Sequence, residues 1–118
     1  MKQIDTLKSE VRPWGSFTII KENKSFKIKK IEIQPGMRLS YQFHKKRSET
    51  WVIIEGEGEI WLDDKIISYK KGDTIIIPRT MKHRISNQGK TKTVLIEIQT
   101  GEYFGEDDIV RIEDDFNR

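Results

Sequence analysis

The sequence predicts an all-β fold, an antiparallel sandwich or barrel formed by a single domain. Apolar and polar residues alternate with period two along most of the chain, and helical periodicity is hard to find. Turn-forming groups such as Pro35-Gly36 and Lys71-Gly72-Asp73 separate the alternating runs at short intervals. The 118 residues are enough to bury a core as one domain, and the absence of cysteine excludes a disulfide framework. Many short strands in one small domain are typical of sandwiches and barrels.

The strand pattern appears in a series of short runs. We expect strands at residues 17–20, 26–33, 39–44, 50–54, 59–62, 65–69, 74–77, 84–86 and 92–99. Within residues 26–33 the alternation slips by one position near Lys30, which predicts a β-bulge there. The acidic segment 105–118 is expected to hold a short helical turn.

Composition and charge exclude several classes of protein. The formal net charge is +3 and charged residues make up 35% of the chain, but the lysines are scattered among acidic residues. Nucleic acid binding would require a basic stripe with interleaved aromatic residues, and the sequence has none. No apolar run approaches the length of a membrane span or forms a secretory signal core. We therefore expect a soluble cytoplasmic protein that binds neither nucleic acid nor membrane.

The chain contains only two histidines, and each lies in a spaced pattern of polar residues and glycines. The patterns are Gly36-x5-Gln42-x-His44-x4-Glu49-x6-Gly56 and Gly72-x5-Pro78-x4-His83-x3-Asn87. Residues i and i+2 of a strand point to the same face, so Gln42 and His44 project together. A short loop then returns the chain at Glu49, and His83 comes from a later strand. Together these four side chains would form a mixed nitrogen and oxygen site for zinc, manganese, iron, cobalt or nickel.

Each proposed ligand also has a plainer interpretation. His44 would instead cap a loop, and His83 would be a surface residue beside Lys82 and Arg84. Gln42 is the weakest ligand, because a neutral amide oxygen is a poor donor and a hydrogen bond to a neighbouring strand would satisfy it. The joint spacing of the two histidines favours the metal site.

The two patterns resemble the two motifs of the cupin superfamily, although Gln42 stands where the first motif usually begins with histidine. Three segments are similar to the C-terminal domain of the type II phosphomannose isomerases, the bifunctional mannose-1-phosphate guanylyltransferase/mannose-6-phosphate isomerases. They are Arg12-Pro13-Trp14-Gly15-Ser16-Phe17, Pro35-Gly36-x-x-Leu39-Ser40-x-Gln42-x-His44-x-x-Arg47-x-Glu49-x-Trp51 and Gly101-x-Tyr103-x-Gly105-Glu106-Asp107-Asp108-Ile109-Val110-Arg111. The chain departs from that family at Lys45, Lys46 and Thr50, where the family usually carries histidine.

The resemblance covers residues 11–118 and leaves 1–10 as an N-terminal extension of one domain, 1–118. It implies the cupin double-stranded β-helix, an antiparallel jelly-roll barrel, with Gln42, His44, Glu49 and His83 as ligands of a divalent metal ion. It implies the interconversion of mannose 6-phosphate and fructose 6-phosphate and, as in similar small cupins, a homodimer. The guanylyltransferase half of those proteins has no counterpart here, so we expect no guanylyltransferase activity.

An isomerase of this kind needs a base that moves a proton between C1 and C2, and positive charge for the phosphate. Glu97 is the first candidate for the base, because the similar family has an acid there, and Lys29 is the second. Glu97 would otherwise be a surface carboxylate on an edge strand. Arg12 and Arg47 are the candidates for the phosphate, since arginine offers bidentate contacts, although Arg47 would otherwise face solvent in a loop. Trp14 is expected to pack in the core.

Two other functions stay open at this point. The same barrel hosts many chemistries, so another enzyme of small molecules is one alternative, such as a nucleotide-sugar ketoisomerase, an epimerase or a dioxygenase. A non-catalytic module that binds a sugar or a metal is the other. The presence of both Glu49 and His83 argues against a barrel that has lost its site.

Overall fold

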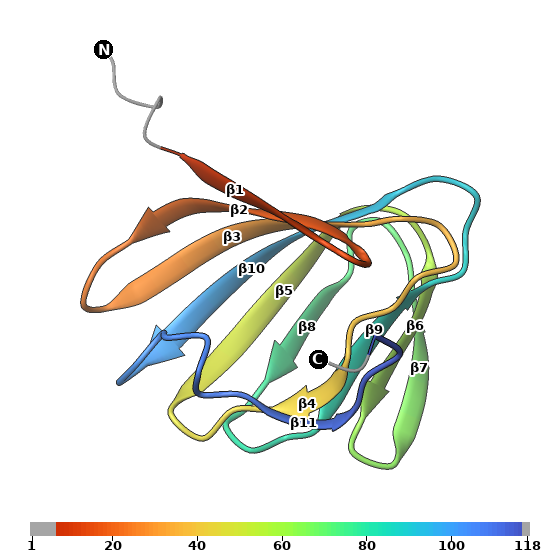
Figure 1. The fold of residues 1–118 in the computed structure, drawn as a ribbon. Coiled ribbons are helices and arrows are strands. Elements are labelled where there is room, and N and C mark those ends of the chain that lie inside the picture. The colour runs from red at the N-terminus through yellow and green to blue at the C-terminus, as the bar shows by residue number, and fades with distance from the viewer. Residues whose placement is uncertain (1–6, 117–118) are drawn as a thin grey trace.

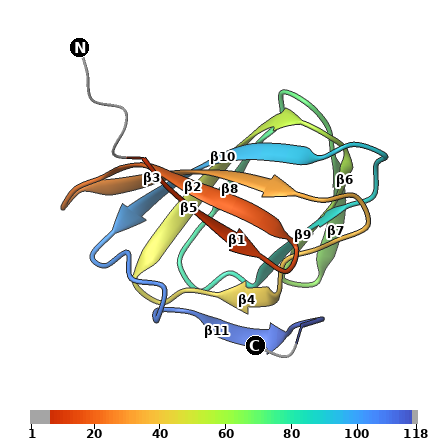
Figure 2. The same ribbon diagram turned by 45° about the horizontal axis from the view of Figure 1, so that its top comes forward.

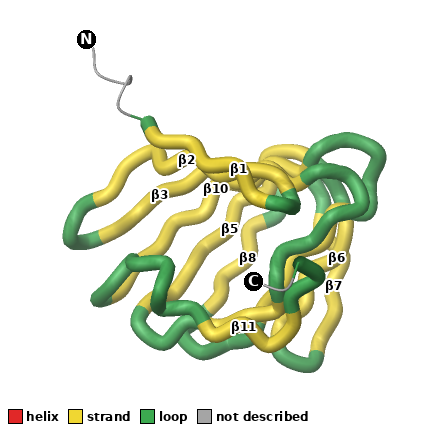
Figure 3. The backbone as a smooth tube through the Cα atoms, viewed as in Figure 1, coloured by secondary structure: helices red, strands yellow, loops and turns green. Residues whose placement is uncertain are grey.

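Two antiparallel sheets face each other across a common interior in a computed structural model, which describes residues 7–116 (Figure 1, Figure 2). The first sheet has six strands in the order β1-β2-β3-β10-β5-β8, and the second has five in the order β11-β4-β9-β6-β7. The strands are β1 Lys8–Arg12, β2 Gly15–Glu22, β3 Phe26–Ile33, β4 Tyr41–Phe43, β5 Arg47–Glu55, β6 Gly58–Leu62, β7 Lys65–Tyr69, β8 Thr74–Ile77, β9 His83–Asn87, β10 Thr93–Gly101 and β11 Val110–Glu113. Loops and turns connect them (Figure 3), and the all-β class is confirmed.

The predicted strands are all present, with small differences at their ends. Two strands were not predicted: β1, which pairs with β2, and β11, which pairs with β4. Strand β11 lies in the segment that was expected to hold a helical turn, and that prediction is wrong for the described part of the segment. Three of its four residues, Val110, Arg111 and Glu113, pair instead with the open edge of β4. Such pairing satisfies backbone groups that the edge would otherwise leave exposed.

The β-bulge predicted near Lys30 lies in the neighbouring strand instead. Strand β3 alternates between half-buried and buried positions without interruption. Its inward positions are Lys27, Lys29, Ile31 and Ile33. The apparent slip arises because the first two inward residues are lysines, so the apolar pattern changes face while the backbone does not. The register shift falls in β2, between Ile19 and Lys21.

The apolar core lies between the two sheets. Ile33, Ile53 and Leu95 of the first sheet and Ile60 and Ile85 of the second are almost completely buried. Trp14 is buried in the same cluster, as expected. No helix in the described part of the chain is long and apolar enough to cross a membrane.

The connection between β10 and β11 crosses from the first sheet to the second beside the loop that joins β4 to β5 (Figure 1). The backbone N–H of Glu102 donates to the carbonyl of Lys46 at 2.9 Å. The Asp108 carboxylate accepts the backbone N–H groups of Lys45 and Lys46 at 3.2 and 2.9 Å. These hydrogen bonds fix the connection next to the strand that carries Glu49.

Candidate metal centre

Three of the four predicted ligands converge inside the barrel. One ligand atom from each of His44, Glu49 and His83 lies within 4.8 Å of the other two. The Nδ1 of His44 is 3.5 Å from one Glu49 oxygen, and the Nε2 of His83 is 3.8 Å from the other. Both histidines are only 3% exposed, so the interpretations of His44 as a loop cap and of His83 as a surface residue are wrong.

The alternation of strand side chains explains why these residues meet. Ser40, Gln42 and His44 are all buried, while the residues between them are only partly so. Gln42 lies opposite His83 in the pairing of β4 with β9 in the second sheet, whereas Glu49 is on β5 in the first. The candidate centre is therefore formed between the two sheets and not within one of them.

Both histidines have a nitrogen suited to a metal. The Nδ1 of His83 lies 2.9 Å from the Met81 carbonyl, a contact in which Nδ1 donates, so Nε2, the atom that faces Glu49, is the nitrogen that would bind a metal. The Nε2 of His44 is buried and has no hydrogen-bond partner among residues 7–116. Burial, followed by the charge of Arg47, lowers the pKa of His44 to about 3, so this histidine stays neutral, the form that binds metals.

Gln42 is placed at the edge of this group. Its amide nitrogen donates to the Ser40 hydroxyl at 2.9 Å, so a metal would meet the amide oxygen. Two imidazole nitrogens, one carboxylate and one amide oxygen are a donor set that fits a divalent ion of the first transition series or zinc.

A second buried carboxylate lies beside the metal ligands. Glu97 is 5% exposed on β10, which pairs with β3 and β5 in the interior of the first sheet, so its interpretation as a surface residue on an edge strand is wrong. The indole N–H of Trp51 donates to Glu49 at 3.1 Å and to Glu97 at 3.2 Å. The amide of Gln99 donates to the other oxygen of Glu97 at 2.7 Å.

The two carboxylates differ in how readily they hold a proton. Burial raises the pKa of Glu97, and the charge of Glu49 adds to the effect. Burial also acts to raise the pKa of Glu49, but His83 and Arg47 outweigh it and hold this pKa low. Glu49 is therefore the charged ligand, and Glu97 is the group that protonates more easily.

Arg47 is buried against the centre, and its interpretation as a solvent-facing loop residue is wrong. It is 4% exposed, its Nε donates to one oxygen of Glu49 at 2.9 Å, and its Nη2 forms an ion pair with the same oxygen at 2.8 Å. Its Nη1 is directed elsewhere, 3.6 Å from the carboxylate of Glu106. The ammonium group of Lys29 lies 2.8 Å from the same carboxylate and 4.2 Å from the centre of the Phe17 ring.

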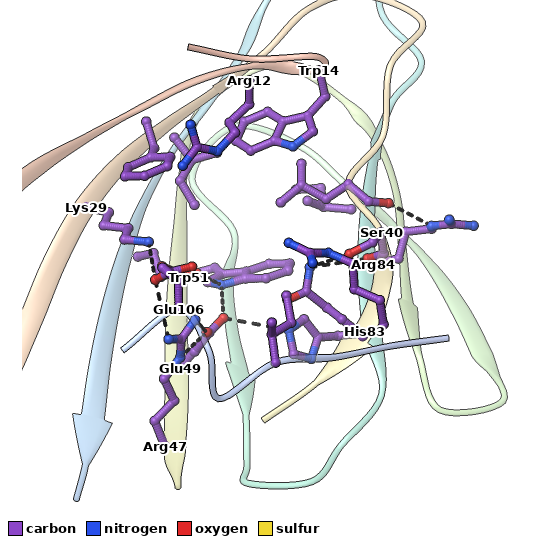
Figure 4. A pocket seen from close by; sticks show the side chains of 18 residues that line it. Arg12, Trp14, Lys29, Ser40, Arg47, Glu49, Trp51, His83, Arg84 and Glu106 are labelled. Atoms are coloured by element: carbon purple, nitrogen blue, oxygen red, sulfur yellow. Dashed lines mark hydrogen bonds and ion pairs between the residues drawn. The ribbon is translucent and has the colours of Figure 1, made fainter. Parts of the chain in front are cut away.

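Arg12 lines the same pocket but does not join Arg47 (Figure 4). Its guanidinium pairs with Glu10 at 2.6 Å and stacks 4.9 Å from the Phe17 ring, in the part of the pocket where Figure 4 shows Trp14. The pair of arginines expected for a phosphate is thus not assembled.

Sequence reasoning missed three residues of the site. Lys27 shares the inward face of β3 with Lys29, and the apparent slip in alternation was the signal for it. Trp51 and Glu106 stand inside the family-like segments, but no spacing rule indicated that Trp51 would join two carboxylates or that Glu106 would reach back to β3 and β5.

The family model described as mannose-6-phosphate isomerase C-terminal matches residues 2–114. The chain belongs to this family. It is 40% identical over 107 residues to the xanthan biosynthesis protein XanB of Xanthomonas campestris pv. campestris (strain B100), covering 91% of this chain and 23% of XanB. It is 40% identical to the alginate biosynthesis protein AlgA of Pseudomonas aeruginosa, covering 91% of this chain and 22% of AlgA. The mannose-1-phosphate guanylyltransferase of Sinorhizobium fredii is 38% identical, with 89% and 20% covered. The chain therefore spans less than a quarter of these relatives.

Solved structures agree on the fold. The capsular polysaccharide assembling protein CapF of Staphylococcus aureus superposes with a TM-score of 0.77 at 28% identity, over 91% of this chain and 32% of CapF. A double-stranded β-helix protein of Klebsiella pneumoniae gives a TM-score of 0.78 at 18% identity, over 96% of this chain and 91% of that one. The predicted double-stranded β-helix of the cupins is thus confirmed.

Proposed function

We propose that this domain is a metal-dependent aldose–ketose isomerase that interconverts mannose 6-phosphate and fructose 6-phosphate. The observation that carries the proposal is the convergence of His44, Glu49 and His83 beside a second buried carboxylate, Glu97. Two comparisons support a mannose phosphate as the substrate. The family model is that of the C-terminal part of mannose-6-phosphate isomerase, and one relative is a mannose-1-phosphate guanylyltransferase.

His44, Glu49 and His83 would hold the divalent ion, with the amide oxygen of Gln42 as a fourth ligand. The donor set suits zinc, manganese, cobalt, nickel or iron. Bound there, such an ion would act as a Lewis acid towards the oxygens on C1 and C2 of the open-chain sugar.

Glu97 is the residue best placed to move the proton. Its carboxylate would take the proton from C2 of the aldose and return it to C1, while the hydroxyl proton on O2 passes to O1, so that the carbonyl moves from C1 to C2. The reverse reaction uses the same group. Its raised pKa brings it nearer to the pH range in which one carboxyl group serves both as base and as acid. The N–H groups of Trp51 and Gln99 fix the two oxygens of Glu97, and burial keeps bulk water away from them.

The test combines metal analysis of the purified protein with an isomerase assay on mannose 6-phosphate. We expect His83→Ala to lose both metal and activity. Glu97→Gln should keep the metal and reduce turnover by about 10²- to 10⁴-fold, the usual contribution of a general base. Glu55→Gln is the matched control, because Glu55 is exposed on the same strand as Glu49 and should leave both properties unchanged.

Each other outcome points to a different function. Protein that binds no divalent ion in stoichiometric amount, even after reloading, would contradict the proposal. Metal-loaded protein that leaves hexose 6-phosphates unchanged but acts on a nucleotide-linked sugar would favour the other enzyme class. Binding of sugars without turnover would indicate a non-catalytic module.

A further inference from the structure

Three buried cations converge on one oxygen atom next to the candidate centre. The Oε2 of Glu106 lies 2.8 Å from the Nζ of Lys29, 3.6 Å from the Nη1 of Arg47 and 3.9 Å from the Nζ of Lys27. Lys27, Lys29 and Arg47 are only 4–6% exposed, because all three project inward from the first sheet. Such burial of positive charge is costly unless anionic oxygens surround it.

The Glu106 carboxylate satisfies this cluster only in part. One oxygen is shared by all three cations, and the Nη1 of Arg47 is buried with no hydrogen-bond partner among residues 7–116. Lys27 also lies 3.9 Å from Glu22, whose side chain is about half exposed, and 3.4 Å from the Phe104 carbonyl. An anion with several terminal oxygens would give each cation its own acceptor, and phosphate is the common biological group of that shape.

The Glu106 side chain is able to leave without unfolding the barrel. It is 50% exposed, while Phe104 on one side of it is buried and Asp108 on the other is fixed by the backbone of Lys45 and Lys46. Rotation of one side chain into solvent would therefore open the cluster, and the cations would stay in place.

Arg47 links this cluster to the metal ligands. Two of its nitrogens contact Glu49, and the third faces Glu106. An anion bound in the cluster would thus be separated from the candidate metal by one guanidinium group. A sugar phosphate has its reacting carbons at one end and its phosphate at the other, which matches this arrangement.

We propose that Lys27, Lys29 and Arg47 form a binding site for a phosphomonoester dianion, and that the Glu106 carboxylate occupies this site until the anion displaces it. The identity of the anion as a sugar phosphate rests on the proposed function, whereas the site itself does not. This assigns Lys29 to the binding of the anion, a role different from that of a base.

The test is calorimetric titration of the purified protein with inorganic phosphate, with metal content measured for every variant. Glu106→Gln should lower the Kd for phosphate by about tenfold, the equivalent of one charge-assisted hydrogen bond, because the competing carboxylate is gone. Lys29→Met should raise the Kd by at least about tenfold, because one charge-assisted hydrogen bond to the anion is lost. Lys27→Met gives a second reading if Lys29→Met fails to fold.

Glu102→Gln is the matched control, since it removes the same charge from the same connection. The Glu102 side chain is 76% exposed and lies near Arg79 and not near the cluster. An equal gain in the Glu102→Gln and Glu106→Gln variants would show an effect of net charge alone and would overturn the inference. An unchanged Kd in Glu106→Gln would also overturn it, even in a protein that proves to be an active isomerase. The predicted pattern in a protein without isomerase activity would support the site and contradict the proposed function.

Mannose 6-phosphate, titrated in parallel, distinguishes the two sources of the anion. Tighter binding than that of inorganic phosphate, with the same dependence on Glu106, assigns the site to the sugar phosphate. Equal affinity assigns it to the free anion, and binding of mannose 6-phosphate that ignores both Glu106 and Lys29 contradicts the proposal.

Discussion

Acidification should destabilise the metal-free barrel through one histidine. His44 is 3% exposed, and burial together with the nearby charge of Arg47 lowers its pKa from 6.5 to about 3. The unfolded chain therefore binds a proton at this residue in a pH range where the folded chain does not. The stability is complete above pH 6.5, and it falls as the pH decreases from 6.5 towards 3.

The magnitude follows from proton linkage. Each pH unit within this window removes about 1.4 kcal/mol of unfolding free energy for one group. Between pH 7.5 and pH 5.0 the pH falls about 1.5 units below the ordinary histidine value, so His44 alone should remove about 2 kcal/mol. That is a large part of the total stability of a small domain, typically about 5–15 kcal/mol.

The measurement is urea unfolding in the presence of a chelator at pH 7.5, 6.0 and 5.0, for the natural sequence and for His44→Gln. The variant removes the titrating ring, so it should lose about 2 kcal/mol less than the natural sequence between the two extremes. Glu97 has a raised pKa and acts in the opposite direction, but it is present in both proteins, and the comparison largely removes its effect. Parallel curves for the two proteins would refute the reasoning.

Three further predictions concern the core, the metal and the assembly. Ile60→Ala should reduce the unfolding free energy by about 2–5 kcal/mol, because Ile60 is fully buried. Ile76→Ala, whose side chain is 68% exposed, should change the unfolding free energy by no more than about 0.5 kcal/mol. Urea unfolding of both variants tests the prediction. A divalent ion at a hundred times its Kd should stabilise the protein by about 2.7 kcal/mol, and His83→Ala should abolish this gain in thermal unfolding. We expect a homodimer paired through sheet edges or the N-terminal segment, since open edges invite pairing, and light scattering should give about twice the mass of one chain.

The alternation of residues predicted most of the barrel, because inward and outward positions differ chemically along most strands. It failed at β3 because Lys27 and Lys29 occupy inward positions, and an inward lysine looks outward to any rule based on polarity. It missed β11 because strand Val110–Glu113 is exposed at all four positions and so carries no alternation. In both cases the fold is decided by tertiary partners that the local sequence does not contain.

The sequence predicted the candidate metal ligands of the site but not how the charged residues around them are arranged. The spacing of Gln42 on β4 and His44 directly after that strand, with Glu49 after a short loop, follows from period two and was visible in the sequence. The convergence of Lys29 with Glu106 was not, because 77 residues separate them and only the crossing of the β10–β11 connection brings them together. The separation of Arg12 from Arg47 was not visible either, because it depends on the strand order, in which three strands lie between β1 and β5.

The inward residues of β3 and β10 change from polar to apolar at the same level of the barrel. Glu97 on β10 lies opposite Lys29 of β3, and two positions earlier Leu95 lies opposite Ile31 of β3 and Ile53 of β5. A slip of one residue would turn both sets of side chains to the other face, so packing around Leu95 also fixes the register that places Glu97. Buried charges usually reduce stability, and the apolar half of the interior offsets that cost. The barrel therefore separates its two tasks along each strand: one half holds the fold and the register, and the other half carries the charged groups of the site.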